Sequence, residues 1–150
     1  MRKIVGRIAS VGTAVLAASA ALVMTVPHAQ ASASYWTWDA PKSATKVGTL
    51  KSQTITWKYS FTVQLRSGKY GNYTYIWPRV PKSSAADGLR LWLSVYNPST
   101  GKWESGQQAI IKNTTYSQGH RALSGRLYKA CVKADIIGGT AAKCTGSWLV

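Results

Sequence analysis

The sequence predicts a small all-β protein, a single antiparallel β-sandwich or open barrel with one disulfide-linked hairpin, preceded by a signal peptide. Three observations support this prediction. Short segments in which apolar and polar residues alternate recur along the chain, turns rich in Gly, Pro, Asn and Ser separate them, and no segment shows helical periodicity with a cap. Six or seven short strands in one small domain are typical of sandwiches and barrels.

Residues 1–31 are expected to be a cleaved secretory signal peptide. A basic start is followed by an apolar stretch, 8–26, and then by the small residues Ala29 and Ala31 that signal peptidase needs. Cleavage is expected after Ala31, with Ala33 as the alternative register. An uncleaved membrane anchor is the competing interpretation, because the apolar stretch is nearly long enough to span a bilayer. We expect a secreted, extracellular protein without a transmembrane anchor after cleavage.

Beyond the signal, the sequence divides into an N-terminal arm with a linker, 32–51, and a sandwich domain, 52–150. The arm begins with aromatic residues and continues with small, polar and basic residues and one proline, a composition typical of a linker. Interface hot spots favour Trp, Tyr and basic side chains. In the alternative interpretation, the aromatic residues form a strand on the sheet edge. The predicted partner-binding residues are Tyr35, Trp36, Trp38, Lys42 and Lys46.

Within the sandwich domain, the clearest strand is predicted over 54–66, where β-branched and aromatic residues alternate with polar ones. A short second strand is expected over 73–77, stopped by Pro78. A third is expected over 89–96, and a less regular fourth, interrupted at Ser105 and Gly106, over 103–112. These strands account for the middle of the domain.

The segments 126–134 and 142–149 are expected to form the closing hairpin, linked by a disulfide between Cys131 and Cys144. An even pair of cysteines in an oxidising compartment is most simply a disulfide. A loop at 136–139 would place the two cysteines directly opposite each other, within bridging distance. A metal site or a reactive thiol is the alternative, but two cysteines with one distant histidine make a poor zinc set.

The expected mature chain offers few groups for catalysis, and we predict a non-enzymatic protein without cofactor or metal. It shows no serine-nucleophile motif, no glycine-rich phosphate loop and no metal-binding motif. The enzyme alternative is a secreted ribonuclease that uses His120 with Glu104 and Arg121. His120 and Arg121 are expected to lie in a solvated loop. The only side-chain carboxylates are those of Asp39, Asp87, Glu104 and Asp135.

The composition is strongly basic, with 19 Lys+Arg against 4 Asp+Glu and a formal net charge of +15 at pH 7. The predicted signal carries three of the basic residues, so its removal leaves +12. That value exceeds the net charge of about 2–8 that serves solubility in a small domain. We therefore expect an acidic protein surface or an anionic cell-envelope polymer as the partner, and the extracellular compartment disfavours nucleic acid.

One row of aromatic residues at period two, Tyr73, Tyr75 and Trp77, has two interpretations. The rings form an exposed platform that stacks sugar rings, or they are buried in the core, since each contributes a large apolar area. The first interpretation supports a carbohydrate- or cell-wall-binding module. The basic composition also leaves a cationic antimicrobial protein as an alternative.

The Ala-rich signal, the compact basic domain and the closing hairpin around Cys131 and Cys144 resemble the small secreted β-sandwich proteins of actinobacteria. The likeness covers the mature domain, and the cysteine hairpin is its one local motif. Within that group, an aromatic N-terminal arm on a disulfide-bonded sandwich is similar to the adaptor subunit of antibacterial umbrella toxin particles. The resemblance implies a non-enzymatic bridging role in a hetero-oligomeric toxin complex used in bacterial competition, with the arm engaging a partner.

Overall fold

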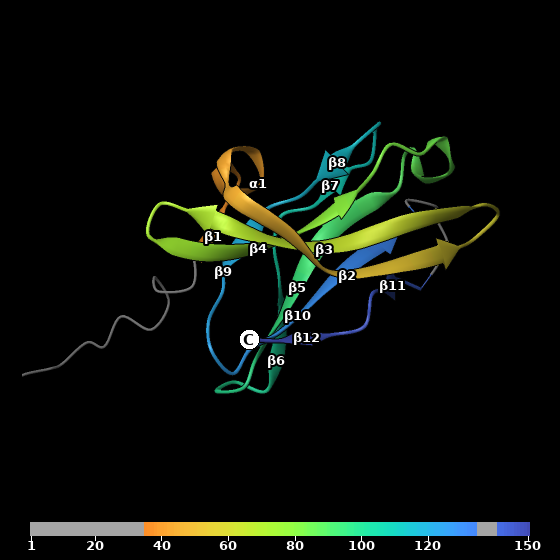
Figure 1. Cartoon of the computed structure of the whole chain (residues 1–150). Helices are drawn as coiled ribbons and strands as arrows, with labels where there is room; N and C mark the ends of the chain where they lie inside the picture. Colours follow the sequence, from red (N-terminus) through yellow and green to blue (C-terminus); the bar gives the residue numbers. More distant parts are fainter. Residues whose placement is uncertain (1–34, 135–140) are drawn as a thin grey trace, which may run out of the picture.

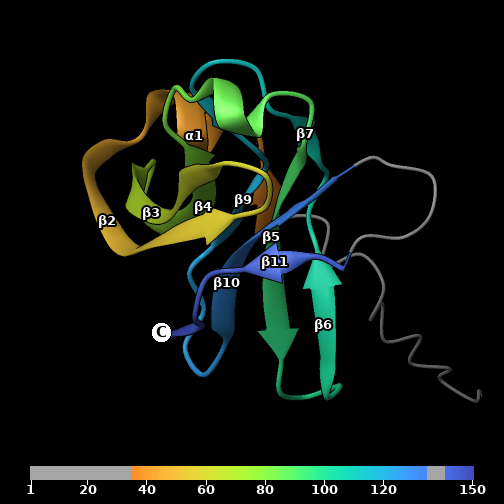
Figure 2. The ribbon, with the colours of Figure 1, turned by 90° about the vertical axis from the view of Figure 1, so that its right-hand side faces the viewer.

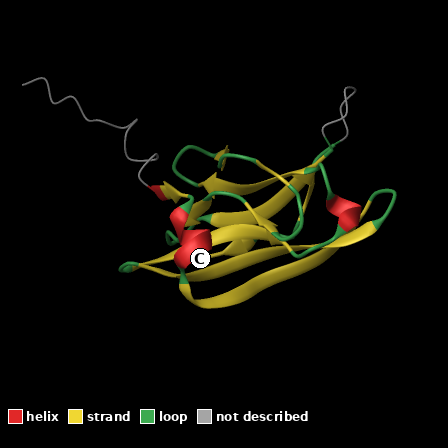
Figure 3. Cartoon of the chain, turned by 90° about the horizontal axis from the view of Figure 1, so that it is seen from above, coloured by secondary structure: helices red, strands yellow, loops and turns green. Residues whose placement is uncertain are grey.

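The computed structural model describes residues 35–134 and 141–150. The predicted signal peptide and the predicted hairpin loop at 136–139 lie outside the described residues. Strands hold 57% of the described chain and helices 8%, which confirms the all-β class. Figure 3 shows strands running through both layers of the molecule, with helical turns only at the periphery.

The strands form two antiparallel sheets that pack face to face (Figures 1 and 2). The first sheet has the order β1-β9-β4-β3-β2, with β8 also paired to β4; the bounds are β1 Trp36–Thr37, β9 Gly119–Arg121, β4 Tyr73–Val80, β3 Ser60–Tyr70, β2 Thr45–Thr56 and β8 Thr115–Tyr116. The second has the order β11-β10-β5-β6, with β12 paired to β10 and β7 to β5; the bounds are β11 Lys143–Cys144, β10 Leu127–Lys133, β5 Arg90–Asn97, β6 Lys102–Ser105, β12 Trp148–Leu149 and β7 Ala109–Ile110.

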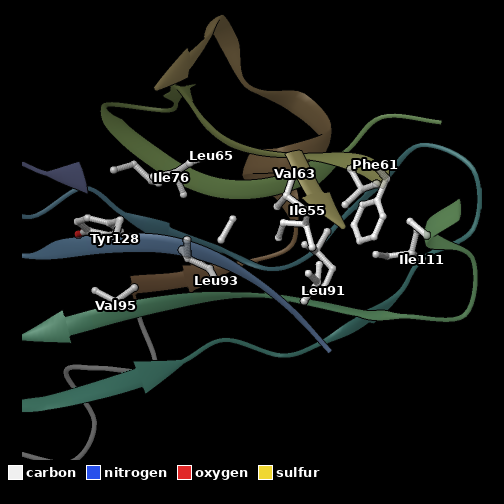
Figure 4. Packing of buried hydrophobic residues seen from close by; sticks show 14 residues of the cluster. Ile55, Phe61, Val63, Leu65, Ile76, Leu91, Leu93, Val95, Ile111 and Tyr128 are labelled. Atoms are coloured by element: carbon white, nitrogen blue, oxygen red, sulfur yellow. The ribbon is translucent and has the colours of Figure 1, made fainter. Parts of the chain in front are cut away.

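The main core fills the space between the two sheets. Alternate residues of each strand point inward, because successive side chains of a strand lie on opposite faces. Figure 4 shows the side chains of the two layers meeting. The first sheet contributes Ile55, Phe61, Val63, Leu65 and Ile76, and the second contributes Leu91, Leu93, Val95 and Tyr128, all buried.

A second, smaller cluster lies on the outer face of the first sheet, beneath the short helix α1 (Asp39–Ser43). Ala40 of α1 packs there with Tyr75 and Trp77 of β4, and all three are buried. Gly68 leaves space for the Trp77 ring in this cluster, because a Cβ at position 68 would lie 2.9 Å from that ring. Of the two interpretations of the aromatic row, burial is therefore confirmed for Tyr75 and Trp77, the exposed platform is excluded for these two rings, and only Tyr73 of the row is exposed.

The segment 54–66, predicted as one strand, is a hairpin. β2 ends at Thr56, β3 begins at Ser60, and Ile55 lies opposite Phe61. Because the connecting loop has an odd number of residues, odd-numbered residues of β2 lie opposite odd-numbered residues of β3 and point to the same face. The alternation of apolar and polar residues therefore continues unchanged through the turn. The turn at 57–59 also contains no Gly, Pro or Asn, the residues that mark most turns.

One other predicted strand limit is corrected. β4 continues through Pro78 to Val80, because Pro78 lies between the residues that pair with β9 and those that pair with β8. A proline is tolerated where the ladder is interrupted. The predicted interruption of the strand 103–112 is confirmed: it divides into β6 and β7 at Gly106, which the Trp36 ring approaches so closely that a Cβ would lie 2.4 Å away.

Residues 35–51, predicted as an arm and linker, belong to the sandwich. β1 pairs with β9, α1 follows, and 45–51 are the first part of β2, so the predicted boundary between 51 and 52 falls within a strand. β3 is long enough to pair with this part of β2 as well, with register shifts between Thr45 and Gly48 and between Thr49 and Lys51. The small, polar residues of this segment have a composition typical of a linker. They form a strand nevertheless, because β3 provides a partner strand for their backbone.

The disulfide is confirmed. Cys131 of β10 lies directly opposite Cys144 of β11, with an S–S distance of 2.03 Å and a Cα–Cα distance of 4.0 Å. Beyond the bridge the backbone leaves β11, and the predicted strand 142–149 resumes as β12, which pairs with the other end of β10. The bridge therefore ties the C-terminal segment to the central strand of the second sheet.

Candidate functional site

A surface cleft of about 450 Å³ lies at the end of the sandwich where β3 turns into β4. Leu50 and Ile76 form the apolar part of its lining, the β3–β4 turn contributes polar residues, and Trp148 and Val150 approach from the C-terminal segment. The first sheet and the C-terminal end of the second both contribute to the lining. Ligand sites in proteins usually have volumes of roughly 300–1,000 Å³, so this cleft is large enough for a small ligand.

The cleft begins where the inward-facing row of β3 changes from apolar to polar. Phe61, Val63 and Leu65 are buried between the sheets, and the next inward positions are Ser67 and Lys69. Ser67 lies opposite Ile76 in the β3–β4 ladder, which places both on the same face. Since polar side chains do not pack into an apolar core, the two layers stay separated by solvent at this end.

Two partly exposed aromatic residues and two cationic residues are among those that line this cleft. Tyr73 is 45% exposed and Trp148 is 37% exposed. The guanidinium carbon of Arg121 lies 3.3 Å from the centroid of the Tyr73 ring, a cation–π contact that the pairing of β9 with β4 sets up. Lys69 contributes the second positive charge.

The chemistry of the lining favours binding an anion that also carries an apolar face. Aromatic rings offer flat apolar surface, and Lys and Arg donate hydrogen bonds to anionic oxygens. Ser67, Asn72 and Thr74 add neutral hydrogen-bonding groups. Among the described residues, no Asp, Glu, His or Cys side chain lines the cleft.

The structure corrects the expectation that His120 lies in a solvated loop. His120 is in β9, fully buried, with its ring centroid 4.6 Å from that of Trp36 and 5.8 Å from that of Tyr128. Its Nδ1 donates to the carbonyl oxygen of Arg121 at 2.6 Å, and its Nε2 has no hydrogen-bond partner in the described part of the chain. Burial lowers the pKa of His120 to about 4, so the ring is neutral at pH 7.

The three residues of the ribonuclease alternative do not form one site. His120 is enclosed, and Arg121 lies on the Tyr73 ring. Glu104 is paired with Arg126 at 3.3 Å and accepts a hydrogen bond from Asn97 at 2.8 Å. The ribonuclease reaction needs two accessible titratable groups in one cleft, and these three residues do not form such a cleft.

The aromatic residues predicted to bind a partner pack within the fold. This arrangement agrees with the alternative interpretation, in which they form a strand on the sheet edge. Trp36 of β1 is half-buried against the main core. The indole N–H of Trp38 donates to the side-chain oxygen of Gln107 at 2.9 Å. Tyr35 is half-buried, with its ring centroid 5.8 Å from the Arg121 guanidinium carbon. Tyr35 therefore contacts a residue of the cleft, whereas Trp36 would have to leave the core to bind a partner.

Lys42 and Lys46 are both exposed, the first on α1 and the second in β2. Their contact with a partner stays a prediction. Lys46 has a positive φ of 51° and lies at the first register shift between β2 and β3, where the strand bends. Neither lysine lines the cleft at the β3–β4 turn.

The residues of the cleft were not predicted as a set, because they come from separate parts of the chain. Lys69 and Tyr73 flank the β3–β4 turn, Arg121 is in β9, and Trp148 is in β12. The one local signal is the change of the inward row from Leu65 to Ser67. That signal marks where a core ends but does not identify the opposite wall.

No group of three or more His, Cys, Asp or Glu residues that could hold a metal ion occurs in 35–134 and 141–150. In the same residues, no helix has the length and apolar character needed to cross a bilayer. The fold and the cleft define a small disulfide-bonded β-sandwich with a cationic, aromatic site at one end. No protein-family model matches the chain, and it has no significant match among curated proteins or solved structures.

Proposed function

We propose that this chain is a secreted, non-enzymatic binding protein that holds an anionic saccharide in the cleft at the β3–β4 turn. The observation that carries the proposal is the combination of exposed aromatic rings, Tyr73 and Trp148, with the cations Lys69 and Arg121 around one cavity. A pyranose ring packs its C–H face on an aromatic ring, while its carboxylate, phosphate or sulfate pairs with Lys or Arg. An anionic polymer of the cell envelope has both features.

Secretion is supported by the N-terminal sequence pattern and by the disulfide between Cys131 and Cys144. Disulfides persist mainly in oxidising compartments outside the cytosol. The positive charge is suited to the same setting, since the net charge of +12 that remains after removal of the predicted signal attracts anionic polymers at long range. The charged side chains among the described cleft residues are the cations Lys69 and Arg121, which suits the binding of an anion.

The proposal is tested by calorimetric titration with three polymers that separate charge from sugar. Polygalacturonate is an anionic glycan, dextran a neutral glycan, and polyglutamate an anion without sugar rings. We expect saturable binding of polygalacturonate and affinities for the other two that are at least about tenfold weaker, because stacking and charge pairing act together. Equal affinity for polyglutamate would contradict the saccharide part of the proposal.

Matched variants locate the binding. Tyr73→Ala and Trp148→Ala each remove one exposed ring from the cleft, and we expect a loss of roughly tenfold in affinity from each, as for an aromatic hot spot. Trp103→Ala is the control, because Trp103 is 40% exposed on the other sheet and lies outside the cleft. An equal loss in all three variants would show that binding is not localised to the cleft.

A second candidate is the adaptor role, with the outer face of the second sheet as the contact surface. One row of directly opposed residues crosses four strands on that face: Leu149, Leu127, Tyr96 and Trp103. Leu149 is 64% exposed, and α1 packs on the other sheet, so it does not cover the row. The Lys129 ammonium lies 3.8 Å from the Trp103 ring centroid, which gives the row a basic edge suited to an acidic protein surface.

The adaptor role is tested by identifying what copurifies with the native protein from culture medium by mass spectrometry. We expect a stoichiometric protein partner that is lost in Trp103→Glu, where a negative charge enters the row, and kept in Tyr73→Ala. A protein that elutes alone, or a partner that Trp103→Glu retains, would contradict this candidate.

A further inference from the structure

Arg66 of β3 and Arg79 of β4 lie next to each other on the outer face of the first sheet. Arg79 is opposite Gln64 in the β3–β4 ladder, and Arg66 is opposite Trp77. Both arginines line a hollow of about 250 Å³ that is separate from the cleft at the β3–β4 turn. Pro41 of α1 and Tyr116 of β8 contribute apolar surface to the same hollow.

The hydrogen bonds of the two guanidinium groups go to neutral oxygens. The side-chain oxygen of Gln64 accepts from Arg66 Nη1 at 3.3 Å and from Arg79 Nη1 at 3.1 Å. The carbonyl oxygen of Gly48 accepts from Arg66 Nε at 3.1 Å. Neither arginine is paired with a carboxylate among the described residues. Each guanidinium has five N–H donors, so most of these donors have no acceptor from the described chain.

Two adjacent positive charges without an acidic neighbour repel each other. Burial lowers the pKa of Arg66, and the charge of Arg79 lowers it further, which reflects this repulsion. If the pair only supported the fold, a glutamate at position 64 would serve better than Gln64, since it has the same shape and would neutralise part of the charge. The sequence therefore leaves an anion position open between the two arginines.

We infer that Arg66 and Arg79 form a clamp for a tetrahedral oxyanion, a phosphate or sulfate group, carried by a ligand whose apolar part lies against Pro41 and Tyr116. Arginine side chains bind such groups through paired N–H donors, with more geometric specificity than lysines. The hollow accommodates the anion and an adjoining ring of modest size. This site is independent of the saccharide proposed for the cleft, so failure of one leaves the other unaffected.

The first test is an NMR titration of the ¹⁵N-labelled protein with phenyl phosphate, inorganic phosphate and inorganic sulfate. We expect saturable shifts at the Arg66 and Arg79 side-chain N–H groups and at the amides of Thr114 and Tyr116. Tighter binding of phenyl phosphate than of inorganic phosphate would confirm the apolar wall, and comparison with sulfate identifies the preferred anion. Shifts spread over the surface lysines without saturation would overturn the inference.

Arg79→Gln and Lys102→Gln form a matched pair for the second test. Each removes one positive charge, but Lys102 is exposed on β6, away from the hollow. Arg79 bonds only to Gln64 among the described residues, so its loss leaves the β3–β4 ladder intact. We expect phenyl phosphate to bind at least about tenfold more weakly to Arg79→Gln and with unchanged affinity to Lys102→Gln. Equal effects would overturn the clamp.

Gln64→Glu separates a binding role from a structural one. The new carboxylate would lie between the guanidinium groups, so the melting temperature is expected to rise while phosphate affinity falls at least about tenfold. This variant also keeps the test decisive if Arg79→Gln unfolds. Unchanged phosphate affinity in Gln64→Glu would overturn the inference, whatever the change in melting temperature.

Discussion

At the scale of single residues, His120 is the side chain whose environment differs most from its ordinary one. Its ring lies against the rings of Trp36 and Tyr128, and a backbone carbonyl accepts the Nδ1 proton. The carbonyl oxygen of Arg121 also accepts from the Tyr128 hydroxyl at 3.0 Å, so it keeps a donor without the imidazole. Because His120 is fully buried, protonating it would place a charge where water cannot solvate it, and the nearby charges of Arg126 and Glu104 act on it in opposite directions.

This environment makes stability depend on pH. The pKa of His120 in the folded chain is about 4, below the ordinary value of 6.5, so between these values the unfolded chain binds a proton that the folded chain does not. The stabilisation is complete above pH 6.5 and is lost as the pH falls toward 4. We expect the free energy of unfolding to decrease by about 2 kcal/mol from pH 7.5 to pH 5, measured by urea titration.

His120→Phe is the matched variant for this prediction, since it keeps an aromatic ring and removes the titrating group. We expect its free energy of unfolding to stay nearly constant from pH 7.5 to pH 5. All other titratable groups are the same in both proteins, so the difference between their pH slopes belongs to His120. A pH slope equal to that of the wild type would contradict the assignment to His120.

At the scale of elements, the sequence identified the strands better than their ends. The β3 core row, the β5 segment and the β10–β11 cysteine pair all followed from alternation and compartment. The hairpin at 57–59 was missed because its odd loop length keeps the alternation in phase. Alternation reports which face a residue occupies, and it does not report a reversal of chain direction.

The docking of β1 was the other feature that local pattern could not show. Its two residues, Trp36 and Thr37, pair with β9, more than 80 residues away, and the Trp36 ring packs over Gly106. Only the absence of a side chain at Gly106 permits this contact. The cleft was missed for the same reason, since its walls meet only after both sheets have formed.

We predict that Gly106→Ala destabilises the protein through its contact with Trp36. A Cβ there would lie 2.4 Å from the indole ring, and such overpacking costs about 1–3 kcal/mol in the free energy of unfolding. Gly48→Ala is the control, because no atom lies within 4 Å of a Cβ at Gly48. The measurement is chemical denaturation of both variants.

A double-mutant cycle then tests the docking of β1 itself. In a Trp36→Ala background the new methyl group has space, so the cost of Gly106→Ala should fall close to zero. A cost that is the same with and without the Trp36 ring would indicate that the segment is not docked over Gly106.

The disulfide hairpin supports a further prediction at the scale of elements. The bridge joins residues 13 apart, and closing a loop of this size contributes roughly 3 kcal/mol by restricting the unfolded chain. We expect Cys131→Ala/Cys144→Ala to lose about that much in the free energy of unfolding, measured by urea denaturation without reductant. Wild-type protein under reducing conditions should behave similarly, and an unchanged denaturation midpoint would contradict the role of the bridge.

At the scale of the whole molecule, the proposed binding of an anion rests on charge and shape together. With 19 Lys+Arg against 4 Asp+Glu, most basic side chains have no acidic side chain to pair with, and the ion pair between described residues is Arg126 with Glu104. The charge alone attracts any anion, but the cleft at the β3–β4 turn adds a specific geometry, with Arg121 stacked on Tyr73 and Trp148 nearby in the lining. An anionic partner stays a prediction from the composition, whereas the location of the cleft required the structure.

The most direct test of this account is to map a bound anionic saccharide by ¹H–¹⁵N NMR, with tetragalacturonate as the probe. We predict saturable shifts concentrated on Lys69–Thr74, Arg121 and the Trp148 indole, with few on the second sheet around Trp103. Saturable shifts centred on the Trp103 row, or shifts that track exposed lysines and never saturate, would contradict the central claim that the cleft holds the ligand.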